Sequence, residues 1–399
     1  MLQTSSNSKE RIKPVRQDER SHRIHILGIG NIGKLLAHSL ATVSDRPAIV
    51  LMLHRPALVQ AWNEGGQAIE LVTDGISNKQ KGYEIELIHG SAGDNEPGGS
   101  RDSRSDKNAD VIYNLIIGTK AIHTISALSA IKSRLTQDSS ILFTQNGMGT
   151  IDEVNSKVFQ DSRTRPKYMT AIISHGILSQ GPFSSVHAGL GTTTIGRVPQ
   201  PSPLDAEDSA EEHGGRDSTL SSEYLPALIN QVPVLAAKVV SPIELVQIQF
   251  EKLVINAMIN PLTVIFDCRN GELFARFNIL RLMRSLLSEA SHVIRSLPEL
   301  KTVPGMEVRF SKERLDEVVL RVAEKTSKNV SSMLQDARGG RATEIDYING
   351  YIVERGQQLG IECVCNRALV RMVKDGVKIF DAEVDAFFPR QQSTGVDWG

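Results

Sequence analysis

The sequence has few cysteines, almost no net charge and no long apolar segment. Only three cysteines occur in 399 residues, Cys268, Cys363 and Cys365. Such an odd, sparse set excludes a disulfide framework and favours a reducing compartment, so we expect a cytoplasmic protein, with the mitochondrion as the alternative. Cys363 and Cys365 have no second cysteine pair or histidine cluster near them, so we interpret them as core filling and expect no metal site.

The absence of a run of about 18 apolar residues implies that no segment spans a membrane. A net charge of −1 gives no broad basic face and disfavours nucleic acid, so we expect a small-molecule partner for a monomer or homodimer. The length favours two domains. Residues 1–22 mix acids and bases without an apolar core, which predicts a disordered tail; the acids weaken the alternative of a transit peptide.

A polar stripe lies on an otherwise apolar helix predicted for residues 249–263. At helical spacing, Lys252, Asn256 and Asn260 fall within about 80° of its circumference. A buried ammonium and two carboxamides need partners or a polar cleft. One interpretation is a catalytic lysine with two substrate-orienting amides. The other is a lysine that extends to the surface beside two asparagines bonded to backbone.

The first strong motif is a glycine turn between a predicted strand and a predicted helix. Residues 23–37 contain Gly28, Gly30 and Gly33 in the spacing G-x-G-x-x-G. The motif predicts a Rossmann-type domain that binds a dinucleotide pyrophosphate at the helix N-terminus, with Ile29, Asn31 and Ile32 in the same turn. The alternative is a glycine turn without a ligand.

The end of the second predicted strand, residues 48–53, indicates which dinucleotide binds. An NAD site expects Asp or Glu there, whereas this chain has His54-Arg55-Pro56. A cation suits the 2′-phosphate of NADPH, so Arg55 is the predicted phosphate ligand and NADPH/NADP+ the predicted cofactor. The alternative is a surface arginine without a ligand.

Two further buried strands are predicted at residues 111–117 and 140–144, followed by Lys120 and Asn146. Ligands of open parallel sheets lie beyond the carboxyl ends of the strands, so both residues are site candidates. Asn146-Gly147 could instead form only a turn. Residues 168–176, 185–189 and 192–196 alternate like antiparallel strands at the far edge of this sheet. Their histidines, His175 and His187, are interpreted as structural.

Two polar stretches, near residues 91–109 and 199–223, are predicted to be solvated insertions. After residue 243 the strand patterns end, and long helices are predicted at 276–296, 311–328, 344–359 and 367–380. We therefore expect an α/β Rossmann-type dinucleotide-binding domain at residues 23–242, followed by an all-α domain at 243–390 that carries substrate and catalytic residues.

Several motifs together resemble the ketopantoate reductase (2-dehydropantoate 2-reductase) family. The resemblance extends from about residue 23 to 380, and its later motifs are long and specific. The motifs are Gly28-x-Gly30-x-x-Gly33, Gln145-Asn146-Gly147-Met148-Gly149, Lys252-x-x-x-Asn256-x-x-x-Asn260-Pro261-Leu262-Thr263, Asn270-Gly271-Glu272-Leu273 and residues 331–336 and 343–350.

The resemblance implies NADPH-dependent reduction of 2-dehydropantoate to (R)-pantoate, in pantothenate and coenzyme A synthesis. By motif position, Lys252 corresponds to the catalytic lysine of the family and Glu344 to its essential glutamate. Three further residues correspond to its substrate-binding positions, and two to positions that line the nicotinamide cleft. The substrate-binding set is Asn256, Asn260 and Ser332. The cleft set is Lys120 and Asn146, and Asn146 can also contact substrate. The resemblance also implies that Glu344 lies beside the cofactor.

The chemistry of Lys252 agrees with this assignment independently. Hydride addition to a 2-keto group leaves charge on oxygen, which a nearby ammonium can stabilise and protonate. A related 2-keto acid reductase or a β-hydroxyacid dehydrogenase is the alternative enzyme. A β-hydroxyacid dehydrogenase would be expected to have glycines shortly before the lysine, and residues 243–249 contain none. A non-catalytic NADPH sensor would be expected to lose Lys252 or Glu344, and both are present.

Overall fold

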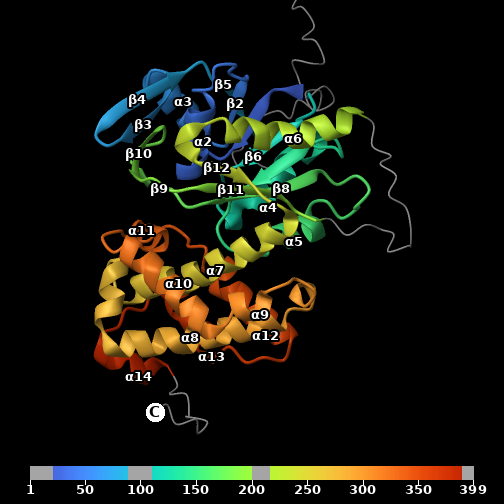
Figure 1. The fold of residues 1–399 in the computed structure, drawn as a ribbon. Helices are drawn as coiled ribbons and strands as arrows, with labels where there is room; N and C mark the ends of the chain where they lie inside the picture. The colour runs from blue at the N-terminus through green and yellow to red at the C-terminus, as the bar shows by residue number, and fades with distance from the viewer. Residues whose placement is uncertain (1–20, 89–109, 200–215, 389–399) are drawn as a thin grey trace, which may run out of the picture.

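The computed structural model describes residues 21–88, 110–199 and 216–388. Its elements form an N-terminal domain of sheets and helices and a C-terminal domain of helices (Figure 1). This arrangement confirms the predicted fold class. Residues 1–20 of the predicted tail, the insertion near 91–109 and residues 200–215 of the second insertion lie outside the described residues. The last two residues of the predicted tail are described, and the carbonyl oxygens of Ser21 and His22 accept hydrogen bonds from Asn114 and Tyr224.

The main sheet has the strand order β12-β11-β8-β7-β6-β1-β2-β5. Strands β1, β2, β5, β6, β7 and β8 are parallel, and β11 is antiparallel to β8. Parallel strands place their carboxyl ends, and so the glycine turn, at one edge. The strands are β1 Ile24–Leu27, β2 Ile49–Leu53, β5 Glu84–Leu87, β6 Asn114–Ile117, β7 Ser140–Phe143, β8 Lys167–Ile173, β11 Thr193–Arg197 and β12 Ala237–Val239.

Helices cover both faces of this sheet, as buried parallel strands require. One core contains Ile24 and Ile26 of β1 with residues of α2 and α6, and the other contains Leu27 with residues of α4 and α5. The alternation along β1 thus supplies both cores. The helices of this domain are α2 Asn31–Leu40, α3 Pro56–Glu64, α4 Ala121–Ile131, α5 Thr150–Lys157 and α6 Arg216–Asn230.

A second sheet, of order β4-β3-β10-β9, was not expected. It contains β3 Ala68–Thr73, β4 Ile76–Lys81, β9 Gly176–Ser179 and β10 Ser184–Gly189. The prediction that residues 185–189 lie at the edge of the main sheet was therefore wrong, although 193–197 do pair antiparallel with β8. Alternation identifies a strand but not its neighbour, and β10 pairs in parallel with the distant β3.

The end of the second insertion also differs from the prediction. Residues 216–223, expected within a loop, begin helix α6. The later part of α6 carries Leu225, Leu228 and Ile229, which are buried in one of the two sheet cores. Burial of this apolar stripe stabilises a helix that the polar composition of its first turns does not indicate.

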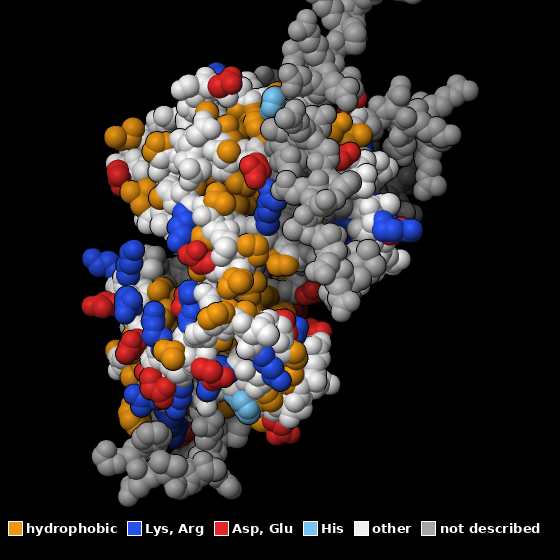
Figure 2. All heavy atoms as spheres, turned by 45° about the vertical axis from the view of Figure 1, so that its right-hand side comes forward, with side chains coloured by type: hydrophobic (Ala, Val, Ile, Leu, Met, Phe, Trp, Pro, Cys, Tyr) orange, Lys and Arg blue, Asp and Glu red, His pale blue; other side chains and the backbone are white. Residues whose placement is uncertain are grey.

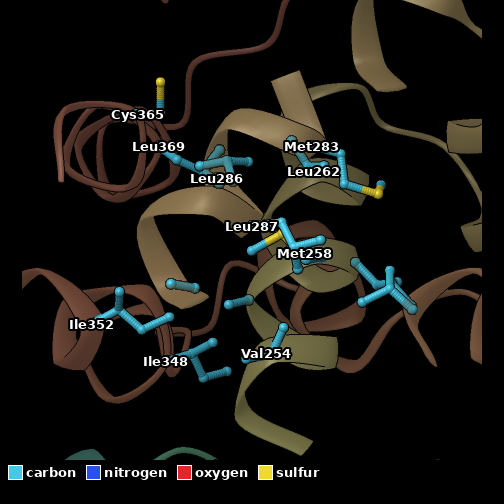
Figure 3. Packing of buried hydrophobic residues seen from close by; sticks show 14 of the residues in the cluster. Val254, Met258, Leu262, Met283, Leu286, Leu287, Ile348, Ile352, Cys365 and Leu369 are labelled. Atoms are coloured by element: carbon cyan, nitrogen blue, oxygen red, sulfur yellow. The ribbon is translucent and has the colours of Figure 1, made fainter. Parts of the chain in front are cut away.

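The C-terminal domain is built around α7, which begins at Pro242, next to the expected boundary. Ser241 caps its N-terminus by accepting a hydrogen bond from the N–H of Glu244. Figure 3 shows Val254, Met258 and Leu262 of α7 packed among residues of α8, α12 and α13. The helices are α7 Pro242–Ile265, α8 Phe277–Ser296, α9 Met306–Arg309, α10 Lys312–Lys325, α11 Ser332–Arg338, α12 Asn349–Gln358, α13 Val364–Lys374 and α14 Val384–Phe387.

Candidate active site

The glycine turn between β1 and α2 has no room for side chains. Gly28 has a φ of +96°, and a Cβ atom there would lie 2.6 Å from the backbone nitrogen of Thr119. A Cβ atom at Gly33 would lie 2.1 Å from the carbonyl oxygen of Gly28. Gly30 is exposed, and no side chain caps α2. The N–H groups of its first turn are therefore available to an anion such as a pyrophosphate.

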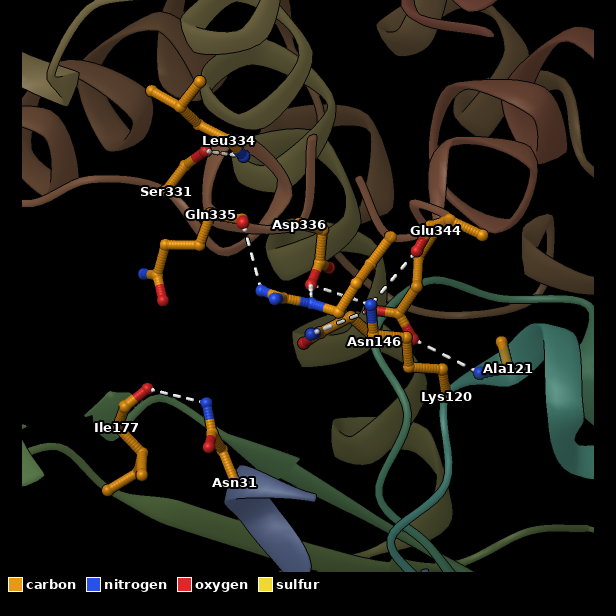
Figure 4. A network of polar contacts seen from close by, with 12 residues as sticks. Asn31, Lys120, Ala121, Asn146, Ile177, Ser331, Leu334, Gln335, Asp336 and Glu344 are labelled. Carbon is orange, nitrogen blue, oxygen red and sulfur yellow. Dashed lines mark hydrogen bonds and ion pairs between the residues drawn. The ribbon is translucent and has the colours of Figure 1, made fainter. Parts of the chain in front are cut away.

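The other residues of the turn hold it in place. Ile29 and Ile32 pack against the apolar core beside the sheet. The side-chain amide of Asn31 donates to the carbonyl oxygen of Ile177 over 3.1 Å, which ties the turn to β9 (Figure 4). This use of Asn31 was not foreseen from the motif.

Lys34, one turn into α2, is buried and fully hydrogen-bonded. Its Nζ donates to the carbonyl oxygens of Gly181 and Ser184 over 2.7 and 2.9 Å and to the hydroxyl of Ser179 over 3.2 Å. Burial lowers the pKa of Lys34 to about 8. The three acceptors identify Lys34 as an anchor between α2 and the β9–β10 turn.

The end of β2 carries an exposed histidine and an exposed arginine. His54 and Arg55 are both exposed, and Arg55 is the residue before α3. Partial burial lowers the pKa of His54, and the charges of Arg55 and of His123 in the first turn of α4 lower it further. His54 thus lies near a histidine of helix α4, which the sequence did not reveal.

The loop after β7 joins the two domains. Gly147 has a φ of +83°, and a Cβ atom there would lie 2.3 Å from the carbonyl oxygen of Tyr347. The same oxygen accepts from the N–H of Met148 over 2.8 Å. Gly147 therefore permits a close approach to the helical domain, so the Asn146-Gly147 pair is more than a turn.

Lys120 and Asn146 reach across the junction, as Figure 4 shows. Nζ of Lys120 lies 2.8 Å from the Asp336 carboxylate of α11 and donates to the carbonyl oxygen of Ala342 over 3.0 Å. The amide of Asn146 donates to Glu344 over 3.3 Å. Asp336 also pairs with Arg341 at 3.1 Å. Asp336 was not among the predicted site residues, although it lies in the quoted motif.

Glu344 lies between the domains, five residues before α12. Its other carboxylate oxygen accepts from the N–H of Ala121 over 3.3 Å, at the start of α4. Burial raises the pKa of Glu344, and the hydrogen bonds from Ala121 and Asn146 and the charge of Lys120 oppose this rise.

Lys252 projects from α7 towards the main sheet. Its Nζ donates to the carbonyl oxygen of Ile173, the last residue of β8, over 2.8 Å. Burial lowers the pKa of Lys252 to about 8, and the charge of Glu344 opposes the fall. The ammonium is therefore not in bulk solvent, and it lies where residues of the two domains meet. Figure 2 shows a notch between the domains on its left-hand side.

A small pocket adjoins Lys252. It connects the loop after β7, the end of β8 and the first half of α7, and its lining includes Asn146 and Lys252 together. Gln145 in this lining donates to the carbonyl oxygens of Ile117 and Thr119, and Thr119 contacts the glycine turn. The lining residues are Gln145, Asn146, Gly147, Thr170, Ala171, Ile172, Gln249, Lys252 and Leu253.

The two asparagines of α7 share the side of Lys252. Asn256 is half-buried and Asn260 is buried, and neither side chain hydrogen-bonds to another residue in the described part of the chain. Helix α7 continues through Pro261 to Ile265. Ser332 is exposed as the first residue of α11, which is capped by its neighbour Ser331. The structure thus leaves all three predicted substrate ligands without a described partner.

His175 and His187 form a buried structural pair. Their ring nitrogens lie 3.1 Å apart, and His175 also hydrogen-bonds to the N–H of Gly191 and the carbonyl oxygen of Leu235. Burial lowers the pKa of both rings. Across the described residues no group of three or more His, Cys, Asp and Glu side chains could hold a metal ion, and no described helix is both long and apolar enough to cross a membrane.

Family models match most of the chain. The model described as "Ketopantoate reductase PanE/ApbA" matches residues 24–200. The one described as "Ketopantoate reductase PanE/ApbA C terminal" matches residues 244–377. The two matches correspond to the two domains.

Curated relatives carry two kinds of name. "Probable 2-dehydropantoate 2-reductase" of Schizosaccharomyces pombe is 32% identical over 358 residues, which are 89% of this chain and 96% of that protein. "Ketoisovalerate reductase" of Beauveria bassiana is 29% identical over 401 residues, covering 90% of this chain and 84% of that protein. Both similarities extend over the two domains.

Solved structures share the fold. A 2-dehydropantoate 2-reductase from Geobacter metallireducens has a TM-score of 0.66 at 17% identity, covering 89% of this chain and 100% of the other. D-mandelate dehydrogenase, in complex with NADH and anilino(oxo)acetate, has a TM-score of 0.63 at 19% identity, covering 91% and 99%. At such identities the likeness concerns the fold alone.

Proposed function

The chain belongs to the ketopantoate reductase family, and we propose that it reduces 2-dehydropantoate to (R)-pantoate with NADPH, in pantothenate and coenzyme A synthesis. The observation that carries this proposal is the position of Lys252. Its ammonium lies at the domain junction, beside the loops that follow the parallel strands, with one described hydrogen-bond acceptor. A donor so placed has further N–H groups for a substrate oxygen.

The residues around the glycine turn suit a dinucleotide. The turn brings the uncapped N-terminus of α2 to the strand edge, where a pyrophosphate would accept hydrogen bonds from Gly30, Asn31 and Ile32. Arg55 would bind the 2′-phosphate. Lys120 and Asn146 would line the nicotinamide cleft, and Glu344, which already bonds to Asn146, would contact the cofactor from the helical domain.

When bound, the reduced nicotinamide supplies the hydride. The substrate carbonyl then gains an electron pair on oxygen, and Lys252 stabilises that charge and gives it one proton. Asn256 and Asn260 would orient the substrate through their amides, and Ser332 would bind its carboxylate at the start of α11. Glu344 keeps the neighbouring Lys252 protonated, since its charge raises the lysine pKa against the effect of burial.

Reduction of 2-ketoisovalerate is the second candidate, because the relative from Beauveria bassiana is named for it. The two acids differ at C3, where 2-dehydropantoate carries a hydroxymethyl group and 2-ketoisovalerate a hydrogen. The decisive test is NADPH oxidation, followed by absorbance, with 2-dehydropantoate and 2-ketoisovalerate supplied separately. The proposal expects a higher kcat/KM for 2-dehydropantoate. A higher value for 2-ketoisovalerate would replace it with the second candidate, and turnover of neither acid would contradict both.

A further inference from the structure

The pocket beside Lys252 contains polar atoms that the residues around it do not satisfy. The hydroxyl of Thr170 and the side-chain oxygen Oε1 of Gln145 are buried and have no hydrogen-bond partner among the described residues. Thr170 is 6% exposed, and both residues line the pocket together with Lys252. Buried oxygens without partners are rare in folded proteins and indicate a ligand or an ordered water.

The size of the pocket suits a single water molecule. Its volume is about 20 Å³, and a cavity needs roughly 10–15 Å³ to hold one water. A 2-keto acid, with its carboxylate and branched carbon chain, is far larger. The pocket therefore has room for one water or one hydroxyl group, and the rest of a keto acid would lie outside it.

The lining also supplies the hydrogen bonds that a buried water requires. Lys252 has N–H groups beyond the one that binds Ile173. A water could accept from Lys252 and from the Thr170 hydroxyl and donate to Oε1 of Gln145, which makes the usual number of about three. Gln249 of the lining is half-buried on α7, one turn before Lys252. Solvent therefore reaches this part of the pocket and can make the fourth hydrogen bond of the water.

We propose that this pocket binds one water molecule, held by Lys252, Thr170 and Gln145, and that this water returns a proton to Lys252 after each turnover. The proposal rests on the proposed function, in which Lys252 gives its proton to the substrate oxygen. The neutral amine then accepts a proton from the water, an N–H bond forms and an O–H bond breaks. The water regains its proton from a solvent acid, so charge and atoms balance.

Thr170 is thus a positioning residue that acts through the water. Thr170→Val keeps the shape of the side chain and removes the hydroxyl, and Thr170→Ser keeps the hydroxyl. We expect Thr170→Val to lower kcat by about 3- to 10-fold and to raise the solvent isotope effect on kcat, with KM for the keto acid unchanged. Thr170→Ser should restore both values, which a purely structural role would not require.

Unchanged kcat and isotope effect in a folded Thr170→Val protein would overturn the proposal. The pocket could instead take the C4 hydroxyl of the substrate. In that case Thr170→Val would impair 2-dehydropantoate and leave 2-ketoisovalerate unaffected, which would also overturn it. The proposed relay predicts the same loss with both acids.

A crystal structure of the unliganded protein separates this inference from the proposed function. It should contain a water within hydrogen-bond distance of Lys252, Thr170 and Gln145, and the Thr170→Val crystal should lack it. A pocket that is dry in the unchanged protein would contradict the inference even if the enzyme is active. A water there in a protein that turns over no keto acid would support the site and refute the function.

Discussion

Among the described residues Lys34 is buried and Lys252 is half-buried, and these two lysines differ in their surroundings. Burial lowers the pKa of both Lys34 and Lys252 to about 8. Lys34 donates to three protein oxygens between α2 and the β9–β10 turn. Lys252 donates to one, faces a pocket and has a carboxylate, Glu344, in its electrostatic environment.

The difference teaches that burial and a shifted pKa do not identify a catalytic group. Structural ammonium groups shift in the same way when they are desolvated. What separates Lys252 is the N–H groups it has left for a ligand and its place at the carboxyl edge of the sheet. Lys34 directly follows the glycine motif, so its distance from that motif in the sequence alone would make it the stronger candidate for a catalytic group.

The largest expected effect comes from removing each ammonium in turn. Lys252→Met should lower kcat by at least about a hundredfold with little change in stability, because it removes the proton donor. Lys34→Met should leave kcat per folded molecule nearly unchanged and lower the free energy of unfolding by about 2–4 kcal/mol, because three acceptors lose their partner. Turnover assays and denaturant unfolding measure both. Equal loss of activity in the two variants would contradict the assignment of a catalytic role to Lys252 and a structural role to Lys34.

Glu344→Gln tests the carboxylate whose charge acts on Lys252 and not on Lys34. The change keeps the shape and removes the charge that raises the lysine pKa. We expect the alkaline fall in kcat/KM to move to lower pH, and kcat/KM at pH 7 to drop by about 10- to 100-fold. The pH profile of the variant, compared with the unchanged protein, is the measurement. An alkaline limb at the same pH would remove Glu344 from this role.

Arg55→Ala tests the proposed contact with the 2′-phosphate of NADPH, at the carboxyl edge of the main sheet. Loss of the guanidinium should weaken the binding of NADPH by about tenfold or more and leave the binding of NADH nearly unchanged, since only NADPH carries the 2′-phosphate. Kd values from fluorescence titration would show this. Lys132→Ala, at the far end of α4, is the matched control for a lost surface cation. Equal weakening of both nucleotides by Arg55→Ala would contradict the phosphate contact.

The smallest effect concerns stability and pH. The pKa of Lys34 is about 8 in the folded chain, against an ordinary lysine value of 10.5, so between these values the unfolded chain binds more protons. Stability should therefore rise with pH across this window, and Lys34→Met should make the rise shallower. Urea unfolding at pH 8 and 10 tests it. If the free energy of unfolding of Lys34→Met changed with pH as in the unchanged protein, the interpretation of Lys34 as a buried, charged anchor would be contradicted.

Local patterns predicted much of the site. The glycine spacing located the turn, and helical spacing placed Lys252, Asn256 and Asn260 on one side of α7. These features depend on residues close in sequence, where periodicity is informative. The fold class and family followed from the same motifs.

Long-range pairing was not predictable in this way. The second sheet joins β3 to β10 across more than a hundred residues, and no local signal marks that partner. The acceptor of Lys252 is a backbone carbonyl, that of Ile173, which any residue type provides. The unpartnered hydroxyl of Thr170 also depends on packing between strands and α7, so only the structure reveals it.

The pH dependence of kcat/KM tests most directly whether Lys252 is the proton donor. With NADPH saturating and 2-dehydropantoate varied, the account predicts a tenfold fall per pH unit above about 8, the pKa of Lys252. The residual activity of Lys252→Met should lack that limb. A kcat/KM that stays level to pH 10 in the unchanged protein, or a limb that persists in Lys252→Met, would contradict the account.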